Sequence, residues 1–195
     1  MVVSPIEYRY GRKQIKDIFD EETRLRYMLS VEAAIARAES ELGIIPAEAY
    51  ENIQKAVDSG SVRIEEVRQV ENEIKHDVMA MVKVLSKYSG DGSRYVHLGV
   101  TSNDINDTAT ALQMRDFSSL YRSNIVSFIR TIIGLVERYR DLPMMGRTHG
   151  QHASPITLGL KFAVYLAEMI RHLDRWDQMS TRPCRNWRGS WRKGA

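Results

Sequence analysis

The stretch that decides the fold is residues 105–139, INDTATALQMRDFSSLYRSNIVSFIRTIIGLVERY. Its apolar residues recur at the spacing of one helix face from Ile105 to Tyr139. The pattern predicts a single helix, because a dense group of capping residues precedes it at 101–104 and a proline-containing segment ends it at 141–143. At 1.5 Å per residue this helix is roughly 50 Å long, longer than a compact domain of this size is wide. It therefore needs partner helices.

Cap and turn residues divide the rest of the chain into further helices. Gly43 follows an amphipathic pattern where a left-handed C-terminal cap is expected, and Pro46 and Pro155 occupy the preferred first position of a helix. No stretch alternates as a β-strand does, and no internal repeat is visible. The sequence therefore predicts an all-α fold, with further helices over residues 21–42, 46–58, 63–88 and 154–179 and with loops over 89–100 and 144–153.

The helix predicted over residues 154–179 is apolar nearly all the way round. A helix of this kind belongs inside a bundle. Two long helices cannot enclose each other, so the remaining walls must come from absent sequence or from other copies of the chain. We expect an obligate oligomer, a truncated protein, or both. The expected domains are an N-terminal helical domain over residues 1–103 and the first, incomplete part of a long-helix bundle over 104–179.

Composition excludes several classes of protein. Of the 195 residues, 43% are hydrophobic and 27% are charged, which is typical of a soluble globular chain. No apolar run reaches the roughly 18 residues of a membrane span, and the N-terminus lacks the pattern of a signal peptide. The single cysteine, Cys184, excludes an internal disulfide and a cysteine-based metal cluster. These features predict a cytoplasmic protein with no membrane partner.

The net charge of +3 comes from the C-terminal tail. Residues 181–195, TRPCRNWRGSWRKGA, hold four Arg, one Lys and no acid, and without these five the chain has 23 basic and 25 acidic residues. The body therefore offers no basic stripe, and nucleic acid is not favoured as a partner. A changed reading frame or an artificial junction best explains this atypical segment, 180–195. The alternatives are a nucleic-acid-binding tail, with Arg for phosphates and Trp for stacking, and a divergent segment of the fold.

Three short polar segments are not required by helix packing. In the first, Lys75-His76-Asp77, the histidine lies about 200° round the helix from Ile74 and points away from the apolar stripe. Taken alone, this position is typical of a solvated histidine flanked by charges.

The second segment, RYVHLGVTSND at residues 94–104, runs into a helix start. Free backbone N–H groups at this point, beside the hydroxyls of Thr101 and Ser102, suit a carboxylate or a phosphate. Ordinary capping by Ser102, Asn103 or Asp104 explains the same residues, and both interpretations can hold at once.

The third segment, GRTHGQH at residues 146–152, joins two long helices. A loop held at both ends by rigid elements is a common position for a functional site. Histidine is the side chain whose unperturbed pKa lies nearest neutrality, which makes the histidines of this loop candidates for general acid or base catalysis. Metal binding is the competing chemistry, but His149 and His152 without a nearby Glu or Cys make a weak ligand set. We expect no metal.

Together these segments resemble the fumarase/aspartase superfamily and, within it, the adenylosuccinate lyase family. The resemblance covers about residues 1–178. Gly150 favours this branch, because sister enzymes typically have Leu at that position. Four motifs carry the resemblance, in the order and at the separations expected: SPIEYRYG (4–11), KHDVMA (75–80), RYVHLGVTSNDINDTA (94–109) and GRTHGQHASPITLG (146–159).

The resemblance implies an elimination that releases fumarate from a succinylated amine. A base removes a Cβ proton and an acid protonates the departing nitrogen. The implied substrates are adenylosuccinate, which gives AMP, and the succinylated aminoimidazole carboxamide ribotide, both in purine biosynthesis. No cofactor is implied, and the enzymes are homotetramers whose active sites combine segments from three subunits.

The resemblance also assigns roles to residues of this chain. His149 matches the general acid, and His76 matches a second active-site histidine that orients the substrate or tunes the acid. The matching substrate-binding residues are Thr101 and Ser102 for a succinyl carboxylate, Arg9 and Tyr10 for the nucleotide, and Lys75, Asp77, His97 and Gln151 for further contacts.

The chain departs from the family pattern near Met179, where a Gly-rich segment such as GAVGT is expected. Family members are typically much longer, and their remaining part carries a Ser-rich loop with the catalytic base. We therefore expect this chain to be truncated, with uncertain activity alone. Two alternatives remain open: another fumarate-releasing lyase of the superfamily, and a non-catalytic helical fragment that associates with other subunits through exposed apolar helices.

Overall fold

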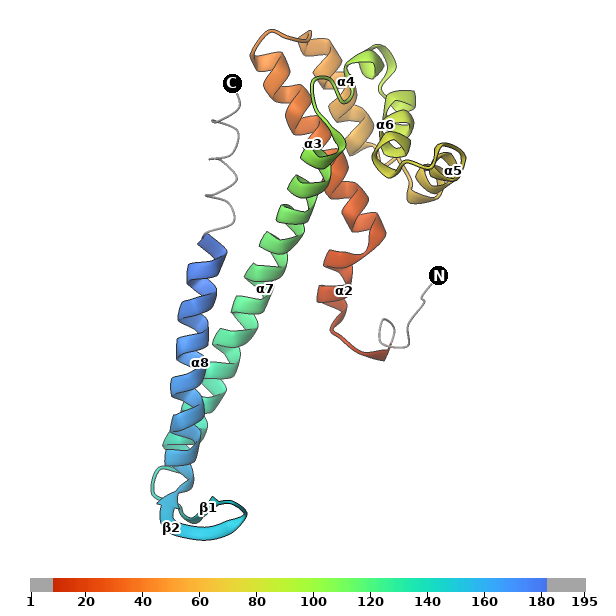
Figure 1. Cartoon of the computed structure of the whole chain (residues 1–195). Coiled ribbons are helices and arrows are strands. Elements are labelled where there is room, and N and C mark those ends of the chain that lie inside the picture. The colour runs from red at the N-terminus through yellow and green to blue at the C-terminus, as the bar shows by residue number, and fades with distance from the viewer. Residues whose placement is uncertain (1–8, 182–195) are drawn as a thin grey trace. The chain divides into compact units, whose positions relative to one another are not determined.

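The computed structural model describes residues 9–181 and is mostly helical, which confirms the predicted fold class (Figure 1). No helix among these residues is both long enough and apolar enough to cross a membrane. The predicted tail lies almost wholly outside the described residues, as does Cys184. The elements are α2 (Lys13–Phe19), α3 (Glu21–Glu41), α4 (Ala47–Asp58), α5 (Ile64–Ile74), α6 (Asp77–Tyr88), the 3-10 helix η1 (Gly90–Tyr95), α7 (Ser102–Arg138), β1 (Pro143–Thr148), β2 (Gln151–Thr157) and α8 (Leu158–Thr181).

The chain divides into two compact units, Met1–Asp116 and Phe117–Ala195. The division falls within α7, whose 37 residues confirm the predicted long helix. The domain boundary expected at residue 103 lies near the start of that helix, and the boundary stays a prediction.

Helix α3 is the central element of the first unit. Asp20 caps its N-terminus by accepting a hydrogen bond from the Glu22 N–H at 3.1 Å, which the sequence analysis did not predict. The predicted cap at the other end is confirmed, because Gly43 adopts a φ of +72° just beyond the helix. Apolar residues at helical spacing on α3 share one core with residues of α4, α6 and the start of α7. The fully buried members of this core include Ile53, Val78, Met81, Leu85 and Ile105.

The helix predicted over residues 63–88 is wrong, because the structure has two helices there. Lys75 adopts a left-handed conformation with φ 57° and ends α5, while its N–H still donates to the Glu71 carbonyl at 2.7 Å. His76 is extended and caps the start of α6. The apolar stripe did not reveal the break, because Val67 of α5 and Val78 of α6 belong to the same core.

In the second unit, the C-terminal half of α7 packs beside α8 (Figure 1). Trp176 contacts the rings of Tyr121 and Phe117 at centroid distances of 4.5 and 6.2 Å, and its indole N–H donates to the Ser118 carbonyl at 3.2 Å. Arg122 forms a two-bonded ion pair with an α8 carboxylate, Asp177, at 2.7 and 3.0 Å. These contacts hold the two helices side by side.

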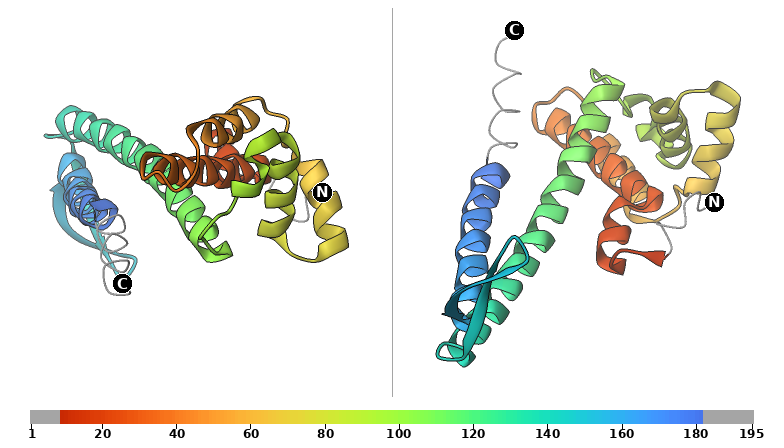
Figure 2. Two further views of the ribbon diagram at one scale, coloured as in Figure 1. Left: turned by 90° about the horizontal axis from the view of Figure 1, so that it is seen from above. Right: turned by 60° about the horizontal axis from the view of Figure 1, so that its bottom comes forward.

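A β-hairpin connects α7 to α8, and the prediction of a loop and of no strand is wrong here (Figure 2). Strands β1 and β2 pair antiparallel from Pro143↔Thr157 to Thr148↔Gln151. The proline expected in the first turn of the last helix, Pro155, instead lies on β2, and α8 begins at Leu158. Thr157 caps α8 by accepting a hydrogen bond from the Leu160 N–H at 3.1 Å.

Candidate functional site

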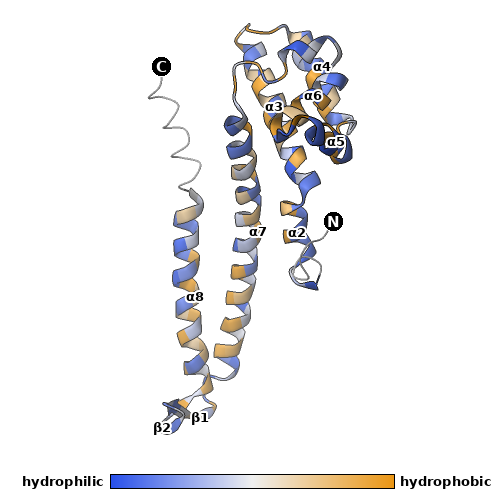
Figure 3. Cartoon of the chain, turned by 45° about the vertical axis from the view of Figure 1, so that its right-hand side comes forward, coloured by the Kyte–Doolittle hydropathy of each residue, from blue (hydrophilic) through white to orange (hydrophobic). Residues whose placement is uncertain are grey.

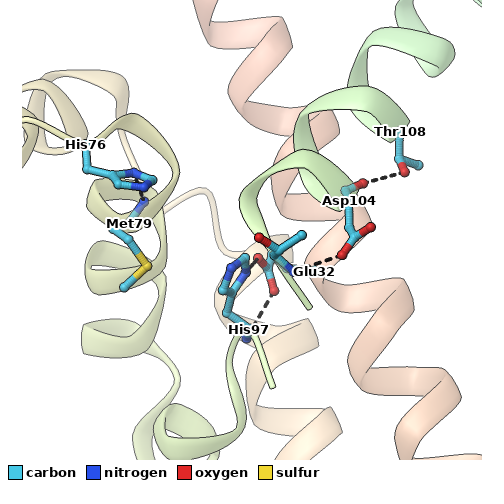
Figure 4. Close-up of polar contacts among 7 residues, drawn as sticks. Glu32, His76, Met79, His97, Asp104 and Thr108 are labelled. Atoms are coloured by element: carbon cyan, nitrogen blue, oxygen red, sulfur yellow. Dashed lines mark hydrogen bonds and ion pairs between the residues drawn. The ribbon is translucent and has the colours of Figure 1, made fainter. Parts of the chain in front are cut away.

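His76 lies between α5 and α6 rather than within a helix. Its Nδ1 accepts a hydrogen bond from the Met79 N–H at 3.3 Å (Figure 4), and it lies 3.5 Å from an Asp77 carboxylate oxygen. Nδ1 cannot accept a hydrogen bond from Met79 and donate one to Asp77 at the same time. The contact with Met79 is the shorter of the two and caps the helix, so Nδ1 is the acceptor. The neutral ring therefore carries its proton on Nε2. With 47% of the side chain exposed, that N–H is a donor available to a ligand.

His97 lies in the segment between η1 and α7, with a left-handed φ of 64°. Both its backbone N–H and its Nδ1 contact the carboxylate of Glu32 on α3, at 3.2 and 2.6 Å (Figure 4). The Glu32 side chain is 1% exposed and that of His97 12% exposed. Burial raises the pKa of Glu32, and the hydrogen bonds from His97 oppose that rise.

Thr101 and Ser102 stand at the start of α7, as predicted. The Asp104 carboxylate accepts a hydrogen bond from the Thr101 N–H at 2.9 Å, and the Asp104 N–H donates to the Thr101 carbonyl at 3.0 Å. The capping interpretation of this segment is therefore confirmed for Asp104. The hydroxyls of Thr101 and Ser102 have no hydrogen-bond partner within residues 9–181, so they stay free for a ligand.

His149 occupies the tip of the β1–β2 hairpin. His149 and Gly150, with φ values of 52° and 73°, form the two-residue turn between the paired residues Thr148 and Gln151. Two successive positive φ angles are typical of a type I′ turn, which matches the twist of a hairpin. The side chains of His149 and Gln151 are exposed, so the turn presents both to solvent.

The hairpin is shaped by a bulge in β2 opposite Gly146. The pairing shifts between Met145 and Arg147, so that one residue of β1 faces two of β2. A Cβ atom at Gly146 would lie 2.5 Å from the Ser154 carbonyl oxygen, which only a glycine avoids. Arg147 and His152 are cross-strand partners, so His152 belongs to the sheet next to the turn rather than to the turn itself.

The predicted site residues fall into both units. Arg9, Tyr10, Lys75, His76, Asp77, His97, Thr101 and Ser102 belong to the first unit, and His149 and Gln151 to the second. Figure 4 shows His76 and His97 in separate contacts, and no hydrogen bond or ion pair described for residues 9–181 joins them. Tyr10 is 67% exposed. A hollow of about 670 Å³ between Ser59 and Tyr88 contains none of these residues.

No group of three or more His, Cys, Asp or Glu side chains within residues 9–181 could hold a metal ion. The functional groups of the candidate site are imidazoles, hydroxyls and the N-terminus of a helix. These groups can bind a carboxylate and transfer a proton.

A family described as Lyase matches residues 7–186 of the chain. The chain belongs to this lyase family. Among curated relatives, the adenylosuccinate lyase of Methanothermobacter thermautotrophicus is 44% identical over 185 residues, which cover 94% of this chain and 41% of that protein. The N-acetyl-S-(2-succino)cysteine lyase of Enterococcus italicus is 35% identical over 89% of this chain and 38% of its own length.

Solved structures agree with this lyase assignment. A fumarate lyase from Mesorhizobium sp. BNC1 matches with a TM-score of 0.83 at 36% identity, covering 89% of this chain and 42% of that one. The chain thus spans about 40% of the length of these relatives. The resemblance drawn from the four motifs is confirmed at the level of the lyase family.

Sequence reasoning missed one polar residue of this lyase chain, Glu32. The signal was present, because Glu32 lies three or four residues from Met28, Leu29 and Ala36 and so falls on the apolar stripe of its helix. A carboxylate on such a stripe is buried only if it has partners.

Proposed function

We propose that the protein containing this chain is an adenylosuccinate lyase, which eliminates fumarate from adenylosuccinate to give AMP and from succinylated aminoimidazole carboxamide ribotide. The observation that carries the proposal is the 44% identity to a curated adenylosuccinate lyase across 94% of this chain. Several further relatives with the same name, such as that of Pyrococcus abyssi at 43% identity, support it. The single cysteine of the sequence supports a cytoplasmic location.

The reaction breaks a C–N bond, removes one proton from the carbon side of that bond and adds one to the nitrogen. A base takes the proton from Cβ, the electron pair forms the double bond of fumarate, and the nitrogen leaves with a proton from an acid. His149 is the acid in this proposal, because the exposed imidazole at the tip of the hairpin turn can reach a substrate and donate a proton to it. The base is not assigned to any residue of this chain.

The remaining residues bind and orient the substrate. The Nε2–H of His76 donates to it, with Lys75 and Asp77 alongside. The free hydroxyls of Thr101 and Ser102, at the positive end of α7, hold a succinyl carboxylate. The substrate contacts proposed for the other positions come from Arg9, Tyr10, His97 and Gln151.

The active protein is proposed to be a homotetramer with shared active sites. Support comes from large apolar side chains that this chain leaves exposed on α7 and α8, where Figure 3 shows apolar residues along both helices. They include Phe128 and Leu160 at 53% exposure and Val164 at 59%. Exposed apolar surface of this kind marks an interaction site. Copies of the chain that cover it would also bring residues of different subunits together.

A second candidate is a lyase for another succinylated compound. The Enterococcus italicus relative, at 35% identity, is named for a succinylated cysteine. A third candidate is a non-catalytic helical fragment, which the same exposed apolar side chains would allow to associate with other subunits.

Fumarate release tests the proposal directly. The full-length protein that contains this chain is incubated with adenylosuccinate, with the succinylated ribotide and with N-acetyl-S-(2-succino)cysteine, and fumarate is followed by ultraviolet absorbance. The proposal expects release from the first two, with AMP as the second product of the first. Release from the cysteine compound alone overturns it in favour of the second candidate.

Sedimentation and activity of the 195-residue chain test the third candidate. A tetramer that releases fumarate rejects the fragment interpretation. An inactive chain that sediments as an aggregate, or only together with other subunits, supports it.

A further inference from the structure

Glu32 is the one fully buried carboxylate among residues 9–181, with 2% of its surface exposed. Its neighbours on the same face of α3, among them Leu25, Met28 and Ala36, belong to the apolar core. An isolated charge in such surroundings is costly, so its partners account for its presence.

Both oxygens of Glu32 contact a single residue. Oε2 accepts the backbone N–H of His97 at 3.2 Å, and Oε1 lies 2.6 Å from its Nδ1. The two contacts fix the left-handed backbone of His97 and the orientation of its ring together. A carboxylate only accepts hydrogen bonds, so the imidazole proton of the contact lies on Nδ1.

The other ring nitrogen has a different environment. Nε2 of His97 has no hydrogen-bond partner within residues 9–181, and it is not one of the fully buried atoms. It therefore keeps contact with solvent. Four residues further along the same segment lies Thr101, at the start of α7 and in the proposed carboxylate site.

We propose that Glu32 is a positioning residue, which holds the proton of neutral His97 on Nδ1 and thereby presents the lone pair of Nε2 to a hydroxyl or N–H group of the substrate. The substrate part of this inference rests on the proposed function. The tautomer part rests only on the contact geometry. The hydrogen bonds of a histidine ring decide which nitrogen carries the proton, so one strong acceptor at Nδ1 is enough to set the tautomer.

Replacing Glu32 by glutamine makes a sharp prediction. The amide has one acceptor and one donor end. If its oxygen accepts the His97 N–H, its NH₂ faces Nδ1 and must donate to it, which moves the ring proton to Nε2. The reverse orientation sets two N–H donors against each other. Glu32→Gln therefore inverts the tautomer while keeping the shape of the side chain.

A matched control lies on the same helix. Glu39, seven residues further on, is a partly buried carboxylate that forms no hydrogen bond or ion pair with His97, and within residues 9–181 its buried Oε2 has no hydrogen-bond partner. Glu39→Gln removes a charge near the same core but leaves both contacts of Glu32 in place. A general effect of removing buried charge would appear in both variants, and an effect on positioning only in Glu32→Gln.

The test is ¹⁵N NMR of the imidazoles in the full 195-residue chain at about pH 9, above the ordinary pKa of histidine. The proposal expects His97 protonated on Nδ1 in the wild type and in Glu39→Gln, and on Nε2 in Glu32→Gln. A wild-type ring protonated on Nε2 overturns it, whether or not the variants fold. So does an unchanged tautomer in a folded Glu32→Gln.

Titration of the full-length protein with AMP, a product of the proposed reaction, tests the substrate part. Because Glu32→Gln turns an acceptor into a donor at Nε2, AMP affinity should fall about tenfold, and Glu39→Gln should bind as the wild type does. Equal affinities in all three overturn the positioning role. Failure of the wild type to bind AMP counts against the proposed function and leaves the tautomer assignment standing.

Discussion

Lys75 is a residue whose backbone conformation lowers the stability of the fold, although its side chain is proposed to bind the substrate. It is exposed and ends α5 in a left-handed conformation, with φ 57° and ψ 37°. For a residue with a Cβ atom this conformation costs about 1–2 kcal/mol, and glycine adopts it freely. Glycine in turn costs about 0.4–1 kcal/mol more in lost freedom of the unfolded chain. Lys75→Gly should therefore stabilise the first unit by about 0.5–1 kcal/mol.

Lys75→Ala is the matched control, because it removes the same side chain and keeps the Cβ atom. Unfolding is followed by far-ultraviolet circular dichroism during heating of the 195-residue chain. We expect the melting temperature of Lys75→Gly to exceed that of Lys75→Ala by about 2–8 °C. The wild type should match the alanine variant, since an exposed lysine loses little on truncation.

If Lys75→Gly were no more stable than Lys75→Ala, the left-handed conformation would carry no cost, and the reasoning would fail. Under the proposed function, both variants of the full-length protein should bind adenylosuccinate more weakly, because both lack the amine. If Lys75→Gly is more stable but binds the substrate more weakly, the lysine side chain contributes to binding at a cost in folding stability.

Two further predictions concern the bulge and a buried carboxylate. Gly146→Ala puts a Cβ atom 2.5 Å from the Ser154 carbonyl oxygen, so the hairpin must open. The backbone amides of the hairpin should then exchange with deuterium faster than in the wild type. Equal exchange rates would mean that the bulge accommodates the extra side chain. Burial is the main cause that raises the pKa of Glu39, and the charge of Glu32 raises it further. Just above pH 4.5 the folded chain therefore binds more protons than the unfolded chain, and its stability falls as the pH rises through that range. Glu39→Gln should flatten this loss and be more stable than the wild type at neutral pH in urea titrations, whereas Glu41→Gln, exposed on the same helix, should follow the wild type.

Helical spacing and caps were enough to predict most of the fold. Helix α3 has a capping aspartate and a glycine beyond its end, and α7 has a continuous apolar face, so local signals and packing agree. The break at Lys75 escaped prediction, because the two short helices bury their stripes in the same core and so keep one apparent period. Only a left-handed lysine marks it, and the sequence does not encode that conformation in an obvious residue.

The hairpin escaped prediction for a different reason. Its strands are mostly exposed, so they lack the alternation of apolar and polar residues that marks a half-buried strand. The signal was the turn itself: His149-Gly150 resembles the Asn-Gly pair favoured in type I′ turns. The histidine chosen from its chemistry is thus also a turn residue, held at a fixed position by the backbone.

The central claim is that His149 donates the proton to the departing nitrogen. His149→Asn in the full-length protein is the most direct test, because asparagine suits the left-handed turn and keeps the hairpin, so a loss of activity reports on the imidazole. Fumarate release from adenylosuccinate should fall about 10²–10⁴-fold in kcat, the usual contribution of a general acid, with unchanged circular dichroism. Wild-type turnover by His149→Asn would contradict the account.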